Sequence, residues 1–376
     1  MEGRADSLQV FGWPIRFAEY HQKVDHLAAL RQIGDDIGDD CCEALASHGI
    51  AVGDFLGDMH SFYATDDRLA AFIDSVTMKP DWLDKEEDAD EIIRRGQLMF
   101  WKYSSTCLMG LLYFSLIGGF AAPKIIKTLD ETKYITKSNN TWKRLNETLE
   151  MVIDCMETNA LKINGAGFKS VLKVRLLHSK VRLMIRKSSH WDQHADNLGI
   201  PINQEEMAAT LLSFSINILE TLRLVGAPVS PADKASYLFI WRYIGYLIGI
   251  KEEFNPCLSY DYAGGYLESI VMHLLTPDKR SREVVSHVLQ SVANRPPLRW
   301  SFACHSEACR FLLGSSLSDE LDIQRGGVLV WAYIKFVFLI LYIMNHTVFN
   351  RITSLNSPFI RKKRQFIRGQ IAAAVK

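Results

Sequence analysis

The chain has no excess of charge of either sign, because lysine plus arginine and aspartate plus glutamate number 43 each among its 376 residues. Without a basic field there is little to attract a phosphate backbone, so we expect no nucleic-acid partner. The sequence also lacks a Gly-x-Gly-x-x-Gly stretch, a Walker loop and a Gly-x-Ser-x-Gly elbow. Nicotinamide, ATP and serine-hydrolase chemistry therefore have no motif to support them.

Cysteine is scarce, and an N-terminal apolar targeting run is missing. The seven cysteines form no repeated framework, which is typical of reduced thiols rather than of a secreted disulfide scaffold. The first thirty residues contain charges throughout and no apolar segment of signal-peptide type. We therefore expect the protein on the cytoplasmic side of any membrane.

Alternating patterns typical of strands are nearly absent, and helical periodicity dominates. The pattern predicts an all-α, multi-helix bundle with long helices over residues 92–120, 204–224 and 231–250. Glycines, prolines and an acidic run suggest three parts. These are an N-terminal helical layer (1–79), a main core (80–325), and an apolar helix with a basic tail (326–376).

The third part raises the question of a membrane. Residues 326–344 contain one charge, Lys335, and are followed by a basic segment at 361–368. A span is long enough, but a basic tail prefers the cytosolic side and would place the body across the membrane. We favour a packed helix or one that contacts a membrane surface, with the tail near anionic lipid.

One predicted helix contains a histidine in an apolar stripe, and this is the most informative local pattern. His178 shares a face with valines and isoleucine, while Arg175 and Arg182 lie three residues before and four after it. A neutral imidazole can ligate haem iron, and the two guanidinium groups could hold the porphyrin propionates. On spacing alone, a histidine on an apolar face is more often an ordinary core residue than a ligand. No Cys-x-x-Cys-His attachment site is present, so any haem would be held by ligation and burial.

A second helix, beginning near residue 139, places Arg144 and Thr148 on the edge of its buried stripe, so that a charged donor and a hydroxyl face the same space. Two other patterns have metal-ligand residue types. His190 and His194 have an i, i+4 spacing, and Cys304-His305 precedes Cys309. Neither has the remaining ligands of a zinc site, and we favour structural roles for both.

Taken together, these motifs resemble the latex-clearing rubber oxygenases and the fungal ER-bound oxygenase of mycophenolic acid synthesis. The resemblance covers roughly residues 80–250 in order. Its motifs are Pro-Asp-Trp-Leu-Asp at 80–84, Arg-Arg-Gly-Gln at 94–97, Ser-Leu-Ile-Gly-Gly-Phe at 115–120, Arg-Leu-Asn-Glu-Thr at 144–148, Val-Arg-Leu-Leu-His-Ser-Lys-Val-Arg at 174–182, and blocks at 199–215 and 237–249.

The resemblance implies a b-type haem in an all-α, globin-like core, with His178 as the proximal iron ligand. Arg144 and Thr148 would lie on the distal side, where dioxygen and an alkene would meet. The rubber oxygenases are similar but have a lysine just before that threonine, where this chain has Glu147. Glu147 then serves either as a base near the substrate or as a structural partner of Arg144.

The activity implied is oxygenation, by cleavage or oxidation, of a carbon–carbon double bond in a hydrophobic, prenyl- or terpenoid-type substrate of secondary metabolism. Such a substrate partitions into membranes, which is compatible with contact between the C-terminus and the endoplasmic reticulum. The alternatives are oxygen insertion into an aromatic or polyketide metabolite, and a non-catalytic helical protein that binds haem or lipid.

Overall fold

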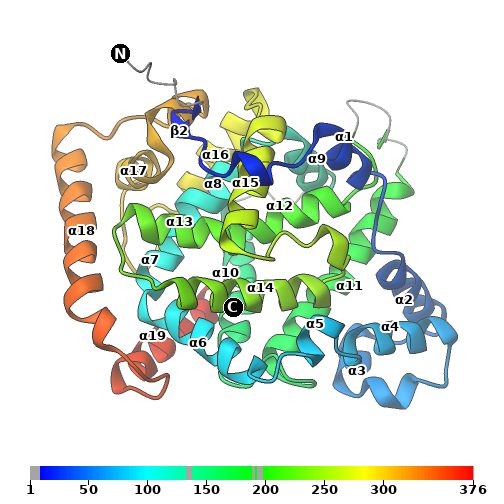
Figure 1. The fold of residues 1–376 in the computed structure, drawn as a ribbon. Coiled ribbons are helices and arrows are strands. Elements are labelled where there is room, and N and C mark those ends of the chain that lie inside the picture. The colour runs from blue at the N-terminus through cyan, green and yellow to red at the C-terminus, as the bar shows by residue number, and fades with distance from the viewer. Residues whose placement is uncertain (1–8, 133–137, 189–190, 193–197, 376) are drawn as a thin grey trace.

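The computed structural model describes residues 9–132, 138–188, 191–192 and 198–375. Within them almost all regular structure is helical (Figure 1). The β-structure of these residues is one antiparallel pair of two-residue strands, β1 (Gln9–Val10) and β2 (Trp13–Pro14). The predicted all-α class is confirmed.

The helices fall into three groups along the chain. The N-terminal group is η1 (Ala18–Tyr20), α1 (Val24–Leu30), α2 (Asp36–Ser47), α3 (Val52–Gly57), η2 (Met59–Phe62), α4 (Asp67–Thr77) and α5 (Asp81–Asp84). The central group is α6 (Ala89–Lys102), α7 (Ser104–Met109), η3 (Gly110–Leu116), α8 (Ile117–Gly119), α9 (Pro123–Glu131), α10 (Ser138–Cys155), α11 (Ala166–Arg186), α12 (Gln204–Phe214), α13 (Ile216–Leu224) and α14 (Pro231–Leu247). The C-terminal group is η5 (Glu252–Phe254), α15 (Tyr260–Leu274), α16 (Lys279–Val292), α17 (Phe302–Glu320), α18 (Val328–Thr347), η6 (Phe349–Arg351) and α19 (Pro358–Val375).

Local sequence explains where several of these helices begin. The Asn203 side chain accepts a hydrogen bond from the Glu206 amide (3.0 Å) at the start of α12. At the start of α14, Ser230 accepts one from the Asp233 amide (3.1 Å), and Pro231 occupies the first turn. Such caps satisfy amides that have no partner within the helix.

Helix α14 crosses the centre of the bundle against α6, and the two backbones approach closely at Gly96. A Cβ atom at this position would lie 2.6 Å from the carbonyl oxygen of Ser236. Helix α10 packs against α11, α16 and α19, while α2 and α3 cover α11 from the side (Figure 1). Helices α10, α11 and α14 thus form the frame around which the apolar core is built.

The long helix predicted for residues 92–120 is broken. Tyr103 leaves helical geometry (φ −102°, ψ 19°) between α6 and α7, and η3 is a seven-residue π-helix. Gly110 at its start lies against α13, where an added Cβ would be 2.8 Å from Thr221 Oγ1. The uniformly apolar sequence gave no sign of these helix breaks, because packing against buried neighbours, and not local capping residues, determines where they occur. π-Helical turns inside α-helices are frequently found at functional sites.

The helix predicted for residues 204–224 is also divided. Ser215 has non-helical dihedral angles (φ −105°, ψ −88°) and separates α12 from α13. Its hydroxyl donates to the carbonyl oxygen of Leu211 (2.8 Å) and accepts a hydrogen bond from the Cys257 thiol (3.3 Å). A serine that bonds the preceding turn in this way bends helices.

Two helical stretches of the described chain are long and apolar enough to cross a membrane, counted by length and composition. Residues 204–224 are 72% buried within the protein. Residues 328–351 have a mean hydropathy of 2.0 and are only 22% buried. A bent pair, residues 104–119 with 123–131, would be a third if it formed one span. Figure 1 shows α18 at the outer edge of the bundle.

Candidate functional site

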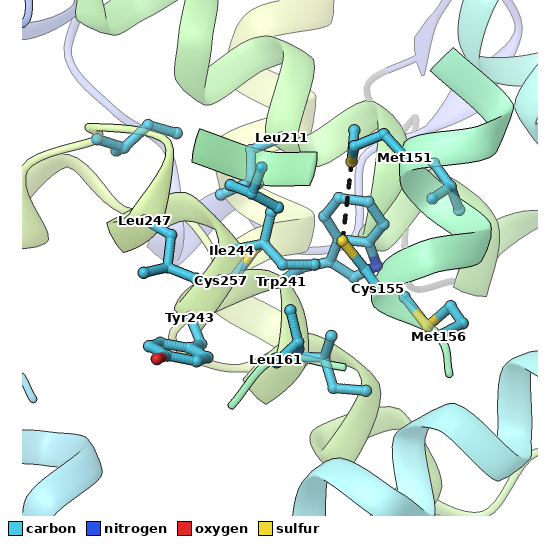
Figure 2. Close-up of a cluster of buried hydrophobic side chains, with 14 of the residues drawn as sticks. Met151, Cys155, Met156, Leu161, Leu211, Trp241, Tyr243, Ile244, Leu247 and Cys257 are labelled. Atoms are coloured by element: carbon cyan, nitrogen blue, oxygen red, sulfur yellow. Dashed lines mark hydrogen bonds between the residues drawn. The ribbon is translucent and has the colours of Figure 1, made fainter. Parts of the chain in front are cut away.

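A cavity of about 1000 Å³ lies within the bundle. This volume is at the upper end of the range for small-molecule sites. Its walls come from α7, η3 and α9 to α12, together with α14 and the C-terminal helix α19. Most of the side chains that line it are apolar, and four of them, Met151, Leu211, Trp241 and Ile244, are shown in Figure 2. The cavity therefore suits a large hydrophobic ligand or cofactor.

His178 on α11 lines this cavity. Its Nδ1 atom is buried and makes no hydrogen bond. Burial, together with repulsion by the Arg182 guanidinium, lowers the pKa of His178 to about 4. The imidazole is therefore neutral at physiological pH and keeps a lone pair that can ligate a metal. Of the residues predicted for the site, His178 fits a haem ligand in burial, charge and access to open space.

Helix α10 brings Thr148 to the same cavity. Arg144, one turn earlier, is not part of the lining, and its Nη1 atom lies 2.8 Å from Oε2 of Glu147. Both side chains of this ion pair are partly exposed to solvent. The structure thus brings together His178 and Thr148, and it pairs Glu147 with Arg144 instead of directing it into the cavity.

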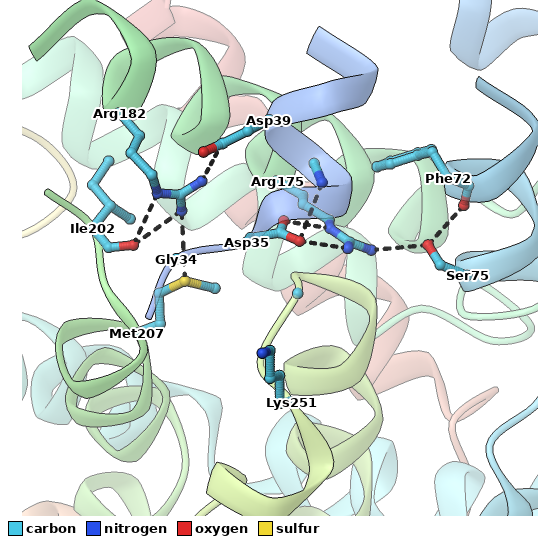
Figure 3. Close-up of polar contacts among 12 residues, drawn as sticks. Gly34, Asp35, Asp39, Phe72, Ser75, Arg175, Arg182, Ile202, Met207 and Lys251 are labelled. Carbon is cyan, nitrogen blue, oxygen red and sulfur yellow. Dashed lines mark hydrogen bonds and ion pairs between the residues drawn. The ribbon is translucent and has the colours of Figure 1, made fainter. Parts of the chain in front are cut away.

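Arg175 and Arg182 are buried and do not line the cavity. Arg175 binds Asp35 through two hydrogen bonds of 2.7 Å, from Nε and Nη2 (Figure 3). Arg182 binds Asp39 and donates to the carbonyl oxygen of Ile202 (2.9 Å). Binding porphyrin propionates would require both arginines to leave these buried carboxylates, so we do not retain that prediction.

The helix predicted around His178 forms, but its spacing gave no sign of the acidic partners of the two arginines, which are Asp35 at the N-cap of α2 and Asp39 within α2. Asp35 and Asp39 are about 140 residues away from Arg175 and Arg182 in the sequence. The packing of α2 on α11 brings each aspartate into contact with its arginine. The two arginines therefore join the N-terminal helices to the helix that carries His178.

Glu206 is a cavity residue that the sequence did not reveal. Burial raises the pKa of its carboxyl group to about 8, and Thr128 donates a weak hydrogen bond to Oε1 (3.4 Å). Its neighbour Glu205 binds Arg31 instead. In the sequence, Glu205 and Glu206 resemble the acidic residues common in a first helical turn, and nothing distinguishes them.

His305 is a second neutral histidine at the cavity. Its Nδ1 atom lies 2.8 Å from the Tyr113 hydroxyl, and burial lowers the pKa of His305 to about 4. All seven cysteines, including Cys304 and Cys309, are free. His190 and His194 lie outside the described residues. No group of three or more His, Cys, Asp or Glu side chains within the described residues could hold a metal ion, whereas haem needs only one protein ligand or two.

The C-terminal segment contributes to the same cavity. The sequence predicts a basic tail near anionic lipid there, but the structure has a helix, α19, packed against α10. Arg368 lies 3.0 Å from Asp154, and Arg364 lies 3.2 Å from Glu157. Lys363 lines the cavity, as do Phe366 and Gln370 of the same helix. Three of the five predicted tail charges, Lys363, Arg364 and Arg368, therefore contact the body of the protein.

The catalytic-domain model of a known oxygenase family, described as ER-bound oxygenase mpaB/B'/Rubber oxygenase, matches residues 101–338. The chain belongs to this family. The resemblance predicted from the sequence motifs is therefore confirmed. Residues that lie outside the matched domain, from α2 and α19, nevertheless pack against the cavity helices.

One relative in this family is the rubber oxygenase of Streptomyces sp. (strain K30), which is 23% identical over 268 residues. The alignment covers 69% of this chain but only 62% of the relative. Among solved structures, latex clearing protein LCP in the closed state aligns with a TM-score of 0.65 over 91% of both chains, at 18% identity. The two proteins share a fold.

Proposed function

We propose that the protein is a haem b-dependent oxygenase that uses dioxygen to cleave or oxidise a carbon–carbon double bond in a hydrophobic, prenyl- or terpenoid-type substrate. Membership of the oxygenase family supports the reaction class. The observation that carries the proposal is His178, a neutral imidazole with an unpartnered buried Nδ1 on the wall of a large apolar cavity.

In this proposal His178 holds the haem, which supplies the activation of dioxygen. Thr148 donates a hydrogen bond in the reacting space, and Arg144 adds positive charge at the edge of that space when it turns from Glu147. The apolar side chains of α7, η3 and α12 exclude water and hold the substrate chain. Cleavage uses both oxygen atoms, one in each of two carbonyl products.

Product analysis tests the proposed reaction. Haem-loaded protein is incubated with a prenylated substrate under isotopically labelled dioxygen, and cleavage places label in two carbonyl fragments. Thr148→Val, which removes the hydroxyl and keeps the shape, should slow turnover by about a hundredfold. Intact substrate with one added oxygen would establish the insertion reaction instead. An absence of oxygen consumption would leave a non-catalytic haem- or lipid-binding protein.

We also propose that α18 contacts the membrane from which the substrate comes, with the endoplasmic reticulum as the natural site. One stripe of this helix, including Ile334, Phe338 and Leu341, packs into the body. The opposite face exposes large apolar side chains, among them Leu329 (86%) and Phe336 (58%). A helix that is apolar on both faces but covered on only one fits a bilayer surface.

A further inference from the structure

Glu206 on α12 presents a carboxyl group to the cavity. The residue lines the cavity and is half-buried. Its Oε1 atom accepts the weak hydrogen bond from Thr128 (3.4 Å). Its Oε2 atom has no hydrogen-bond partner among the described residues and is not closed off from open space. One carboxyl oxygen is therefore accessible to a ligand in the cavity.

The needs of the fold do not account for this carboxyl group. The neighbouring Glu205 is bound by Arg31, whose Nη2 atom lies 2.8 Å from Oε1. Asn203 already caps the start of α12, because its side chain accepts a hydrogen bond from the Glu206 amide (3.0 Å). Glu206 therefore serves neither as an ion-pair partner within the described chain nor as the cap of its helix.

The polar groups next to the Glu206 carboxyl group are mainly donors. The Thr128 hydroxyl and the backbone amides of Ile202 and Asn203 favour its charged form, whereas the charge of Glu205 opposes it. The loss of water outweighs the donors and raises the pKa of Glu206 to about 8. At neutral pH the group is a neutral acid, and its proton has no acceptor in the described part of the chain.

We propose that Glu206 donates a hydrogen bond to an oxygen atom of the substrate and so selects chains that carry a carbonyl, ester or hydroxyl group. The inference rests on the proposed function in so far as the cavity is taken as the substrate chamber. The apolar walls hold the chain, and the acid binds its polar atom. The substrate class is then an oxygen-bearing hydrophobic chain rather than a pure hydrocarbon.

A structural role for Glu206 predicts changes in stability but no preference between ligands of the same shape. The probes are therefore 2-decanone and 2-methyl-1-decene, which differ only in the replacement of the carbonyl oxygen by a CH₂ group. Both are uncharged, and neither can donate a hydrogen bond. Their binding is titrated calorimetrically in the absence of dioxygen, so that the alkene is not consumed, with protein purified from haem-supplied cells.

Wild-type protein should bind the ketone about tenfold more tightly at pH 6 than at pH 9, because deprotonation of Glu206 removes the donor. It should bind the alkene equally at both pH values. Glu206→Gln, whose amide donates at either pH, should bind the ketone tightly at both. Glu206→Leu should bind it at both as weakly as the wild type does at pH 9. Glu150→Gln, at an exposed position of α10, should behave as the wild type.

Other titratable groups line the cavity or lie near α12, and the Gln variant separates them from Glu206. The pKa of Lys363 on the cavity wall is about 8, whereas those of His178 and His305 are about 4. The cationic groups that act on Glu205 are Arg31, Lys124 and His273. All of these groups are present in Glu206→Gln, so a pH dependence that this variant abolishes belongs to Glu206.

The inference is overturned by equal ketone affinity of the wild type at both pH values, by a pH dependence that survives in Glu206→Gln, by an equal dependence for the alkene, or by failure of the ketone to bind. The Soret absorption of the same samples separates this result from the proposed function. Protein that contains haem but shows no such dependence loses the Glu206 subsite alone. Protein that shows the dependence but contains no haem loses the oxygenase proposal alone.

Discussion

Burial determines the chemistry of the histidine at the centre of the site. His178 is neutral because the protein removes water from it and places Arg182 nearby. The same effect keeps His305 neutral on the cavity wall, and the Glu206 carboxyl group is protonated for the same reason. The polar groups that face the cavity thus include several that are uncharged, as expected for a chamber that accepts a hydrophobic substrate.

The buried pair of Arg175 and Asp35 gives a prediction that separates a structural role from haem binding. Arg175→Leu leaves a buried carboxylate unpaired, and we expect the free energy of unfolding in urea to fall by about 3–5 kcal/mol. The double variant Arg175→Leu/Asp35→Leu removes both charges and should recover most of this loss.

Haem content provides the second readout for the same variants. If the arginine serves only Asp35, the double variant should bind as much haem per chain as the wild type. A folded double variant that loses haem would show that Arg175 does contact the cofactor.

Glu206 predicts a specific dependence of stability on pH. Its pKa is raised from 4.5 to about 8, so between these values the unfolded chain releases a proton that the folded chain retains. Wild-type stability therefore falls as the pH rises through this window. Glu206→Gln should gain about 3 kcal/mol over the wild type on going from pH 5 to pH 8. A difference between the two proteins that is the same at both pH values would contradict a buried, protonated Glu206.

Sequence patterns predicted site residues correctly where the residues lie on one face of a single helix. Helical spacing predicted Thr148 at the edge of one buried stripe and His178 within another, and only the family resemblance implied that the two share a site; both line the cavity. The partners of Arg175 and Arg182 could not be predicted, since Asp35 and Asp39 reach them only through tertiary packing. Six residues were predicted for the haem site. The predicted roles of His178, Thr148, Arg144 and Glu147 stay predictions, whereas Arg175 and Arg182 pair with buried carboxylates.

At the scale of elements, the long apolar segments were predicted as helices but their interruptions were not. Ser215 breaks one of them through a hydrogen bond to its own preceding turn. The π-helix η3 forms where α13 approaches Gly110, which depends on a neighbour rather than on local sequence. The C-terminal helix α19 was missed for the same reason, because its basic residues find acidic partners on and after α10.

The outer face of α18 predicts binding to lipid vesicles. Burying Leu329 and Phe336 in the interface contributes a few kcal/mol, on the order of 1.5–3 kcal/mol each. Replacing both with glutamate should therefore reduce the fraction of protein that floats with vesicles at least about tenfold. The matched control is glutamate at Val24 and Met78, which are 50% and 62% exposed elsewhere on the protein. Equal loss in both double variants would contradict a membrane face on α18.

At the scale of the whole molecule, the matched oxygenase domain does not contain the whole environment of the site. The domain covers residues 101–338, whereas Asp35 and Asp39 before it and Lys363 after it contact the cavity helices or line the cavity. The division of the chain into three parts, with boundaries at residues 79 and 325, stays a prediction. The packing of α2 on α11 and α19 on α10 indicates that the parts act together.

The absorption spectrum of protein purified from haem-supplied cells tests the central claim most directly. We expect a Soret band at about one haem per chain, its loss in His178→Gln, and its retention in His305→Gln, a matched variant of the other neutral histidine on the cavity wall. Folded wild-type protein without a Soret band, or a band that survives in His178→Gln, would contradict it.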